Sequence, residues 1–262
     1  LAIVSATGNA DVLFGMENVI GTAIADEIVG SDVANTLIGG AGNDTINGLS
    51  GNNRLEGGAD NDTLISGSGN NYLDGGTGSD TVDYGAIVDN TYNIFADLEG
   101  VTSNVEIRMG TTVIKADNVI NVNNAIGTSG NDTFRGNSFA NTLNGLGGNN
   151  TALYTITALT AGIVADLQAG EVTKTTASGT VKDTLIKIQN LVGSSFDDSF
   201  ITKVGESNII DGGAQGSGGD TIDYSTNSAT KIVVDLDVYH KNNENSLGFS
   251  NDGTYASIQV TS

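Results

Sequence analysis

The sequence predicts an all-β protein in which short parallel strands wind into a right-handed β-solenoid. Glycine-rich stretches recur every eighteen residues, aliphatic residues recur every nine, and the 3.6-residue pattern of an amphipathic helix is scarce. The glycine-rich stretches read GGAGNDTIN from Gly39, GGADNDTLI from Gly57 and GGTGSDTVD from Gly75. One coil of the predicted solenoid therefore contains two nonapeptides.

The strands of this solenoid follow from the nonapeptide pattern. With Asp44 as the sixth position of a nonapeptide, steps of nine place an acid or an amide at every sixth position from residue 17 to residue 80. Two positions later an aliphatic residue occurs each time: Val19, Ile28, Leu37, Ile46, Leu55, Leu64, Leu73 and Val82. Glycines accept positive φ and form the turn, and the aliphatic residue points inward from the short strand that follows. Stacked coils bury a file of side chains that no single repeat can bury.

The amino-acid composition restricts the classes of ligand that the protein is expected to bind. The 262 residues include 31 acidic and 10 basic side chains, which give a net charge of -21. This charge argues against binding to nucleic acid or anionic membranes and favours cations. The absence of cysteine and the single histidine, His240, exclude thiolate and histidine zinc clusters. No apolar run approaches the ~20 residues that span a bilayer, and the N-terminus lacks signal-peptide features, so we expect a processed chain or a fragment.

The nonapeptides from Gly39, Gly57 and Gly75 resemble those of the repeats-in-toxin (RTX) family. The resemblance implies a parallel β-roll that binds Ca²⁺ between coils and folds outside the cell after type I secretion. No GK[ST] follows the glycines, as a phosphate-binding loop requires, and no EF-hand loop is present. Degenerate copies of the repeat are GTSGNDTFR from Gly127, GNSFANTLN from Gly136, GSSFDDSFI from Gly193 and GGAQGSGGDTID from Gly212.

Acids and amides alternate along the unbroken block of residues 12–83. Two nonapeptides per coil place Asp26, Asp44, Asp62 and Asp80 on one edge and Asn35, Asn53 and Asn71 on the other. Carboxylates on coils ~4.8 Å apart repel by ~3.5 kcal/mol per pair at an effective dielectric of ~20. A hard divalent cation between coils would reverse this repulsion, and oxygen ligands suit Ca²⁺. Neutral amides can stack as a hydrogen-bonded ladder, so we expect little or no calcium on their edge.

The expected calcium ligands combine acidic side chains with turn backbone. The edge from Asp26 to Asp80 is expected to form about three sites between coils. Asp132, Asp198 and Asp220 are expected to form isolated or weaker sites, since residue 150 is Asn where an Asp would follow Asp132. The remaining expected ligands are the turn residues Gly39, Gly40, Gly42, Gly57, Gly58, Asp60, Gly75, Gly76 and Gly78.

Longer segments interrupt the repeats. Stretches from Thr81, Thr151 and Thr221 align, with tyrosines at positions 84, 154 and 224. Alternation over 92–98 and 105–109 predicts two strands, and Gly110 a hairpin turn. We expect one modular solenoid over 1–262, as a piece of a longer chain. Its repeat blocks are 12–83, 118–152 and 184–223, and its inserts are 84–117, 153–183 and 224–262.

The sequence predicts no enzyme, because no nucleophile pairs with a base and no carboxylate pair stands apart from the calcium column. The leading hypothesis is a calcium-binding structural module of a cell-surface, S-layer, matrix or adhesin protein, located outside the cell or on a bacterial surface. The alternative is the noncatalytic C-terminal RTX region of a secreted metalloprotease, lipase or polysaccharide epimerase. Besides calcium, we expect self-association or contact with neighbouring modules as partners, and no membrane insertion. Each site filled to ten times its Kd adds ~1.4 kcal/mol to stability, so we expect folding only in millimolar external calcium.

Overall fold

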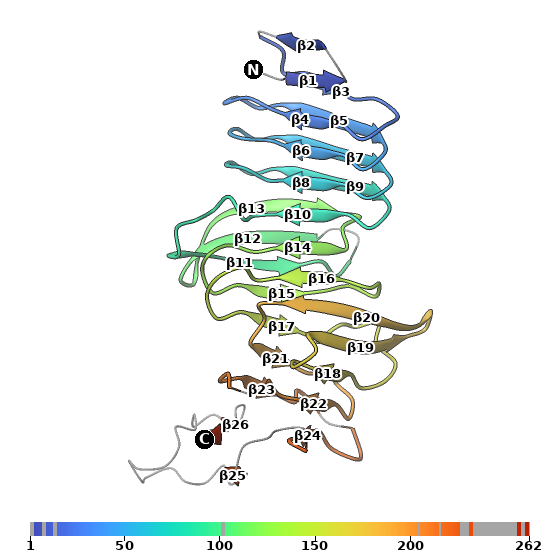
Figure 1. Cartoon of the computed structure of the whole chain (residues 1–262), viewed down its shortest axis with the longest axis vertical. Coiled ribbons are helices and arrows are strands. Elements are labelled where there is room, and N and C mark those ends of the chain that lie inside the picture. The colour runs from blue at the N-terminus through green and yellow to red at the C-terminus, as the bar shows by residue number, and fades with distance from the viewer. Residues whose placement is uncertain are drawn as a thin grey trace.

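The computed structural model describes residues 3–6, 9–12, 15–100, 103–203, 205–214, 216–225, 231–232, 256–257 and 260–261. They form an elongated β-solenoid whose first and last coils lie at opposite ends of the long axis (Figure 1). Among these residues there is no helix, and therefore none long and apolar enough to cross a membrane. The predicted all-β solenoid is confirmed.

Two long sheets carry most of the strands, and we call them sheet I and sheet II. The strands of sheet I lie in the order β4 (Glu27–Val29), β6 (Thr45–Asn47), β8 (Thr63–Ile65), β10 (Thr81–Asp83), β14 (Asn124–Ile126), β16 (Thr142–Asn144), β20 (Gly179–Ile186), β19 (Glu171–Thr176), β18 (Val164–Asp166), β22 (Ser199–Ile201) and β24 (Thr221–Asp223). The strands of sheet II lie in the order β3 (Asn18–Ile20), β5 (Thr36–Ala41), β7 (Arg54–Ala59), β9 (Tyr72–Thr77), β13 (Thr112–Ile120), β12 (Ser103–Met109), β11 (Tyr92–Asp97), β15 (Thr133–Arg135), β17 (Thr151–Leu153), β21 (Asn190–Val192), β23 (Ile209–Asp211) and β26 (Ala256–Ser257). Two short pairs complete the described strands: β1 (Ile3–Ala6) with β2 (Asn9–Val12), and β25 (Lys231–Ile232) with β27 (Val260–Thr261).

Consecutive coils stack in parallel register. Leu37 of β5 pairs with Leu55 of β7, and Leu55 pairs with Leu73 of β9, so equivalent residues lie one above the other at steps of eighteen. The aliphatic file runs through the interior, and its members from Ile28 to Val82 are at most 1% exposed. The interior is therefore one continuous apolar column, as the nine-residue period predicts.

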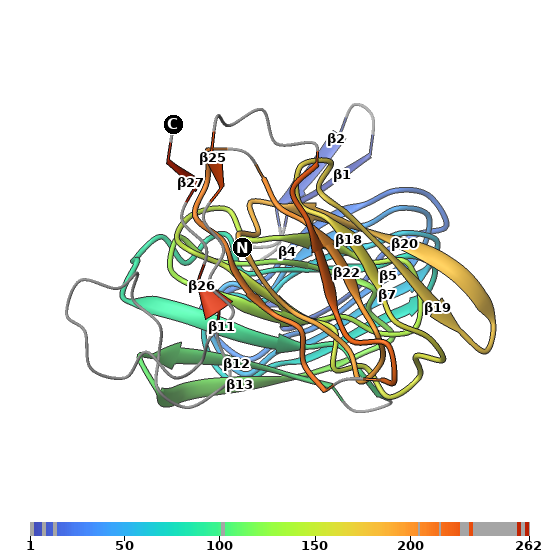
Figure 2. The ribbon, with the colours of Figure 1, turned by 90° about the horizontal axis from the view of Figure 1, so that it is seen from below.

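Two three-stranded antiparallel units interrupt the parallel stacking. The first consists of β11, β12 and β13, and the second of β18, β19 and β20. They extend on opposite sides of the coil (Figure 2). The turn between β12 and β13 contains Gly110 at φ 62°, which confirms the predicted hairpin. Tyr84 and Tyr154 are fully buried in the core. Most of the third expected insert, 224–262, lies outside the described residues, as does His240.

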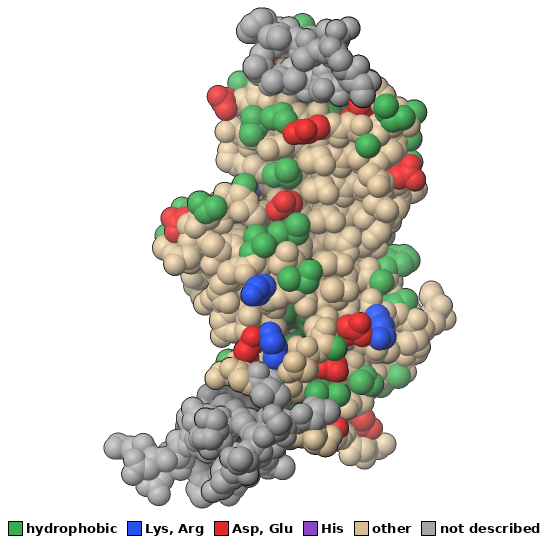
Figure 3. All heavy atoms as spheres, in the orientation of Figure 1, with side chains coloured by type: hydrophobic (Ala, Val, Ile, Leu, Met, Phe, Trp, Pro, Cys, Tyr) green, Lys and Arg blue, Asp and Glu red, His purple; other side chains and the backbone are tan. Residues whose placement is uncertain are grey.

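Each strand of the repeat block follows one turn, so the turns line the two edges of the coil. Asp44, Asp62 and Asp80 precede strands of sheet I, whereas Asn35, Asn53 and Asn71 precede strands of sheet II. The predicted separation of acids and amides is confirmed for this block. The Asp column is buried, and the acidic side chains visible on one face of the molecule are scattered rather than gathered in a patch (Figure 3).

Candidate metal centre

The glycine-rich turns occur in two backbone conformations. In the first kind, which we call αL turns, the second and fourth of the six turn residues have positive φ. In turn 39–44, for example, Gly40 has φ 122° and Gly42 has φ 101°. Positive φ costs glycine little, which explains why this residue is frequent at both positions. The αL turns are 39–44, 48–53, 57–62, 66–71, 75–80 and 145–150.

In the second kind, which we call capped turns, residue 2 has no positive φ and is Thr, Ser or Asn. Its backbone N–H donates to the side chain of residue 6. In turn 127–132, Thr128 N donates to Asp132 Oδ2 over 2.7 Å, and Thr128 Oγ1 donates to Asp132 Oδ1 over 2.9 Å. Ser194 caps Asp198 in the same way, and Thr22 caps Asp26 by donating from both N and Oγ1 to Oδ2. The capped turns are 21–26, 30–35, 127–132, 136–141 and 193–198.

Aspartates in αL turns lack such a cap. The side chains of Asp44, Asp62 and Asp80 are at most 1% exposed, and the Oδ2 atom of each has no hydrogen-bond partner. A buried carboxylate oxygen without a partner costs several kcal/mol unless a cation or a proton compensates it. The three orphaned oxygens therefore mark positions where the fold requires either a cation or a proton.

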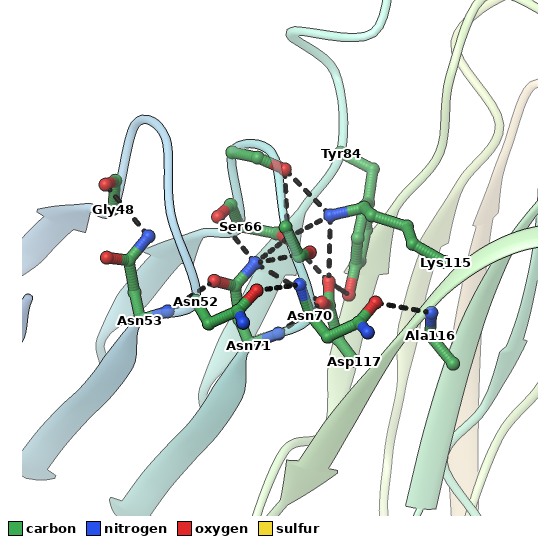
Figure 4. Close-up of polar contacts among 12 residues, drawn as sticks. Gly48, Asn52, Asn53, Ser66, Asn70, Asn71, Tyr84, Lys115, Ala116 and Asp117 are labelled. Atoms are coloured by element: carbon green, nitrogen blue, oxygen red, sulfur yellow. Dashed lines mark hydrogen bonds and ion pairs between the residues drawn. The ribbon is translucent and has the colours of Figure 1, made fainter. Parts of the chain in front are cut away.

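Asparagines in αL turns show which atoms surround the outer side-chain atom of turn residue 6. Asn53 Nδ2 donates to the carbonyl oxygens of Gly48, Ser50 and Gly51 over 2.9 to 3.2 Å. Figure 4 shows this amide beside Asn71, whose Nδ2 donates to Ser66 O over 3.0 Å. The carbonyls of turn residues 1, 3 and 4 thus converge on the outer atom of residue 6. Turns 39–44, 57–62 and 75–80 have the same pattern of positive φ, so we expect their carbonyl oxygens to converge on the orphaned oxygens in the same way.

The other side-chain oxygen of residue 6 links adjacent coils on both edges. Asp44 N donates to Asp62 Oδ1, and Asp62 N donates to Asp80 Oδ1, over 2.8 Å each. On the opposite edge Asn53 N donates to Asn71 Oδ1 over 2.8 Å. The asparagines of successive coils thus form a hydrogen-bonded ladder, in which the amide oxygens of Asn53 and Asn71 each accept from a backbone N–H of the neighbouring coil. In the αL turns of the block, the outer side-chain atom of residue 6 is a donor nitrogen on the asparagine edge and an acceptor oxygen on the aspartate edge.

Oxygens from successive coils also converge. A Cβ atom built on Gly39 would lie 2.1 Å from Asp44 Oδ2 and 2.7 Å from Gly57 O of the next coil. The same atom built on Gly57 would lie 2.2 Å from Asp62 Oδ2 and 2.6 Å from Gly75 O. Glycine at turn position 1 therefore allows a carboxylate oxygen of one coil and a carbonyl of the next to approach the same point.

Burial raises the pKa of Asp44, Asp62 and Asp80, and for Asp62 the value is about 6. The carboxylates of Asp80 and Asp44 contribute to the shift of Asp62, as the repulsion along the column predicts. None of the three Asp side chains forms an ion pair in the described part of the chain. Without a bound cation, this edge therefore holds uncompensated negative charge.

This arrangement fits calcium. Ca²⁺ takes six to eight oxygen ligands and accepts carbonyls beside carboxylates. No cluster of three or more acidic or histidine side chains occurs in the described residues, so most ligands would be backbone oxygens. The residues that would hold calcium are Asp44, Asp62 and Asp80 together with the carbonyls of Gly39, Ala41, Gly42, Gly57, Ala59, Asp60, Gly75, Thr77 and Gly78. Bound calcium supplies the positive charge that the orphaned oxygens lack.

Comparison with known families agrees with this chemistry. The family described as RTX calcium-binding nonapeptide repeat (4 copies) matches residues 20–55, 47–82 and 126–152. The chain carries RTX repeats. RTX nonapeptide repeats bind Ca²⁺, form a noncatalytic module and are typical of secreted extracellular proteins. No curated protein matches the chain.

The structure separates the RTX aspartates predicted from the sequence into groups. Asp44, Asp62 and Asp80 lie in αL turns, whereas Asp26, Asp132 and Asp198 lie in capped turns. Asp220 accepts from Asp198 N over 2.9 Å, in a turn that contains residue 215, which is outside the described part. Gly40, Gly58 and Gly76 provide the positive φ of turn position 2. The sequence-based prediction expected turn carbonyls as ligands but named the glycines and omitted Ala41, Ala59 and Thr77, because the non-glycine residue at turn position 3 has no recurring side-chain type.

Acidification is expected to weaken calcium binding at Asp62. The pKa of about 6 lies above the ordinary 3.8, so between these values the calcium-free folded chain holds a proton that the unfolded chain does not. The calcium-free fold therefore gains stability as pH falls through this window, and the same proton competes with calcium. Calorimetric titrations at about pH 7.5 and about pH 5 should show weaker binding at the lower pH. The Asp62→Asn variant should lose part of this pH dependence of calcium binding. Equal calcium affinity of the wild-type chain at both pH values would contradict the prediction.

Proposed function

We propose that this chain is an extracellular structural module of a cell-surface, S-layer, matrix or adhesin protein, which calcium folds and stiffens after secretion. The observation that carries the proposal is the column of buried, unpartnered carboxylate oxygens at Asp44, Asp62 and Asp80. Each oxygen lies on a different coil, so cations along this edge stabilise the stacking of coils rather than a pocket for a substrate.

The shape and charge of the molecule support a structural role. Strands stack along one long axis, and the hairpins β11–β13 and β18–β20 extend outward from the stack (Figure 1). The net charge of -21 opposes compaction where calcium is scarce. Extracellular calcium modules bind with Kd values of ~10⁻⁴ to 10⁻³ M, so external calcium fills such sites and cytosolic calcium does not. An unfolded chain inside the cell suits passage through a narrow secretion channel.

Calcium is expected to convert the repeat block from an expanded to a rod-like state. Small-angle X-ray scattering and far-UV circular dichroism of the whole chain should show compaction and gain of sheet as calcium rises from micromolar to millimolar. Magnesium at equal concentration is the control, because it demands near-octahedral geometry and dehydrates reluctantly. A scattering profile unchanged by exhaustive chelation would contradict the calcium role.

The surface role needs a separate test. Antibodies against the chain should label the envelope of the producing cells, and a chelator wash should release the label. Label found only in the culture medium, together with a catalytic motif in the complete polypeptide, would instead support the RTX region of a secreted enzyme. Further copies of this module in the complete polypeptide would support the surface protein.

A further inference from the structure

Each hairpin unit places an aspartate where the ladder of the coil would continue with residue 6 of the next turn. Asp117 follows the asparagines of one edge, and Asp183 follows Asn141 on the other edge. Asn71 N donates to Asp117 Oδ1 of β13, and Asn141 N donates to Asp183 Oδ1 of β20, over 2.8 Å each. These bonds continue the ladder that links residue 6 of one coil to residue 6 of the next. Both aspartates are fully buried. The same demand for positive charge therefore arises at the two positions where the hairpins join the coil.

Lysines meet this demand. Lys115 Nζ donates to Gly67 O over 2.7 Å, to Ser66 Oγ over 3.1 Å and to Asp117 Oδ2 over 3.4 Å. Figure 4 shows the ammonium group between the turn and the carboxylate, with Tyr84 donating to Asp117 Oδ2 over 2.9 Å. A lysine has three donors, so its hydrogen-bonding capacity is filled by three oxygens. One of these oxygens is a turn carbonyl and one is a carboxylate, as expected of a cation site in this fold.

A second lysine does the same at the other hairpin. Lys174 Nζ donates to Asn137 O over 2.7 Å, and to Asn141 Oδ1 and Asp183 Oδ2 over 2.8 Å each. Its side chain and that of Asp183 are both fully buried. Lys115 lies on the same strand as its aspartate, whereas Lys174 comes from the neighbouring strand β19. The position of the ammonium group is thus alike in the two hairpins although the lysines occupy different places in the sequence.

We propose that Lys115 and Lys174 are built-in cations that take the place of calcium where the hairpins join the coil, and that they exclude calcium from these coils. A buried carboxylate paired with a covalently attached ammonium has its charge compensated at any calcium concentration. The inference rests on the calcium role proposed for Asp44, Asp62 and Asp80.

Among the described residues up to β22, calcium dependence is accordingly confined to the first repeat block. Among the described residues, the orphaned carboxylate oxygens all belong to the block that ends at residue 83. Beyond it, Asp132 and Asp198 are capped by Thr128 and Ser194, and Asn150 Nδ2 donates to carbonyls of its own turn. The RTX match over residues 126–152 therefore covers repeats that need no calcium. For the described residues up to β22, the calcium dependence expected from the sequence is narrowed to the repeat block that ends at residue 83.

Hydrogen–deuterium exchange of the whole wild-type chain tests this division. In excess chelator, peptides from residues 36–83 should lose about a hundredfold in protection relative to millimolar calcium, while peptides from β11 to β20 should change by less than about threefold. If residues 36–83 and the segment from β11 to β20 lost protection at the same calcium concentration, the inference about the lysines would be overturned. The proposed role of calcium in folding would remain. No calcium effect on residues 36–83 would instead remove the proposed function on which the inference rests.

Substitution of the lysine provides the second test. Lys174→Ala removes the ammonium and leaves its oxygens facing one another, so protection of β18–β20 in chelator should fall about a hundredfold and millimolar calcium should restore at least about tenfold. Lys182→Ala is the matched control, because Lys182 lies on the same hairpin in an exposed pair with Glu171. The proposal is overturned if Lys174→Ala matches the control in chelator. It is also overturned if added calcium restores nothing, including the case in which the variant fails to fold.

Discussion

Joint replacement of Asp44, Asp62 and Asp80 by asparagine is expected to abolish calcium binding along this edge and to keep the block folded in a chelator. Each new amide would place a donor nitrogen where the orphaned oxygen now lies, as Asn53 and Asn71 do on the opposite edge. Removing a buried unpartnered acceptor is worth ~1–3 kcal/mol per site, so the calcium-free stability should rise by several kcal/mol. Calorimetry with calcium and urea denaturation in chelator measure the two effects.

The matched variant replaces the same three aspartates by alanine. It removes the negative charge without supplying a donor, so the turn carbonyls lose any partner at this position and the ladder to the next coil loses its acceptor. This variant should bind no calcium and should be less stable in chelator than the asparagine variant. If the asparagine variant still required calcium to fold, the orphaned oxygens would not be the origin of the calcium dependence.

Gly58→Ala should destabilise the calcium-bound fold by about 3 kcal/mol or more. Gly58 has φ 121°, and an added Cβ would lie 2.0 Å from Gly40 O. That carbonyl belongs to backbone that pairs Gly40 with Gly58 between β5 and β7, so it cannot withdraw without disturbing the stacking of coils. Urea denaturation in saturating calcium, followed by circular dichroism, measures the loss.

Gly179→Ala serves as the control that separates two causes of the stability loss in Gly58→Ala, which are the steric clash of the added Cβ and the strain of positive φ. Gly179 has nearly the same φ, 122°, but an added Cβ meets nothing within 4 Å. This substitution should cost only the strain of positive φ, ~1–2 kcal/mol. Equal losses in the two variants would show that backbone conformation alone, and not close approach between coils, requires glycine in the RTX turns.

Periodicity made much of the fold predictable. A side chain that recurs every nine residues in a stacked coil occupies the same place on each coil, so the file from Ile28 to Val82 could be assigned to the core. The alternation of Asp and Asn likewise fixed which edge carries charge. The hairpin at Gly110 could be predicted because the alternating pattern of residues 105–109 ends directly before this glycine. These features depend on local spacing, which the sequence contains.

Tertiary structure decided which aspartates remain without a partner. Asp26 and Asp44 occupy the same position of the repeat, yet Thr22 caps the first, whereas positive φ at Gly40 leaves the second open. The glycine pattern predicted that turn carbonyls would serve as ligands, but only the folded turn showed that those of turn residues 1, 3 and 4 converge on residue 6. Lys115 contacts Gly67, 48 residues away in the sequence, and Lys174 contacts Asn137, 37 residues away. Only the stacking of coils brings these residues together. The sequence by itself therefore determined the coil and its acidic edge, and the folded chain determined where a cation is needed and where a lysine already supplies it.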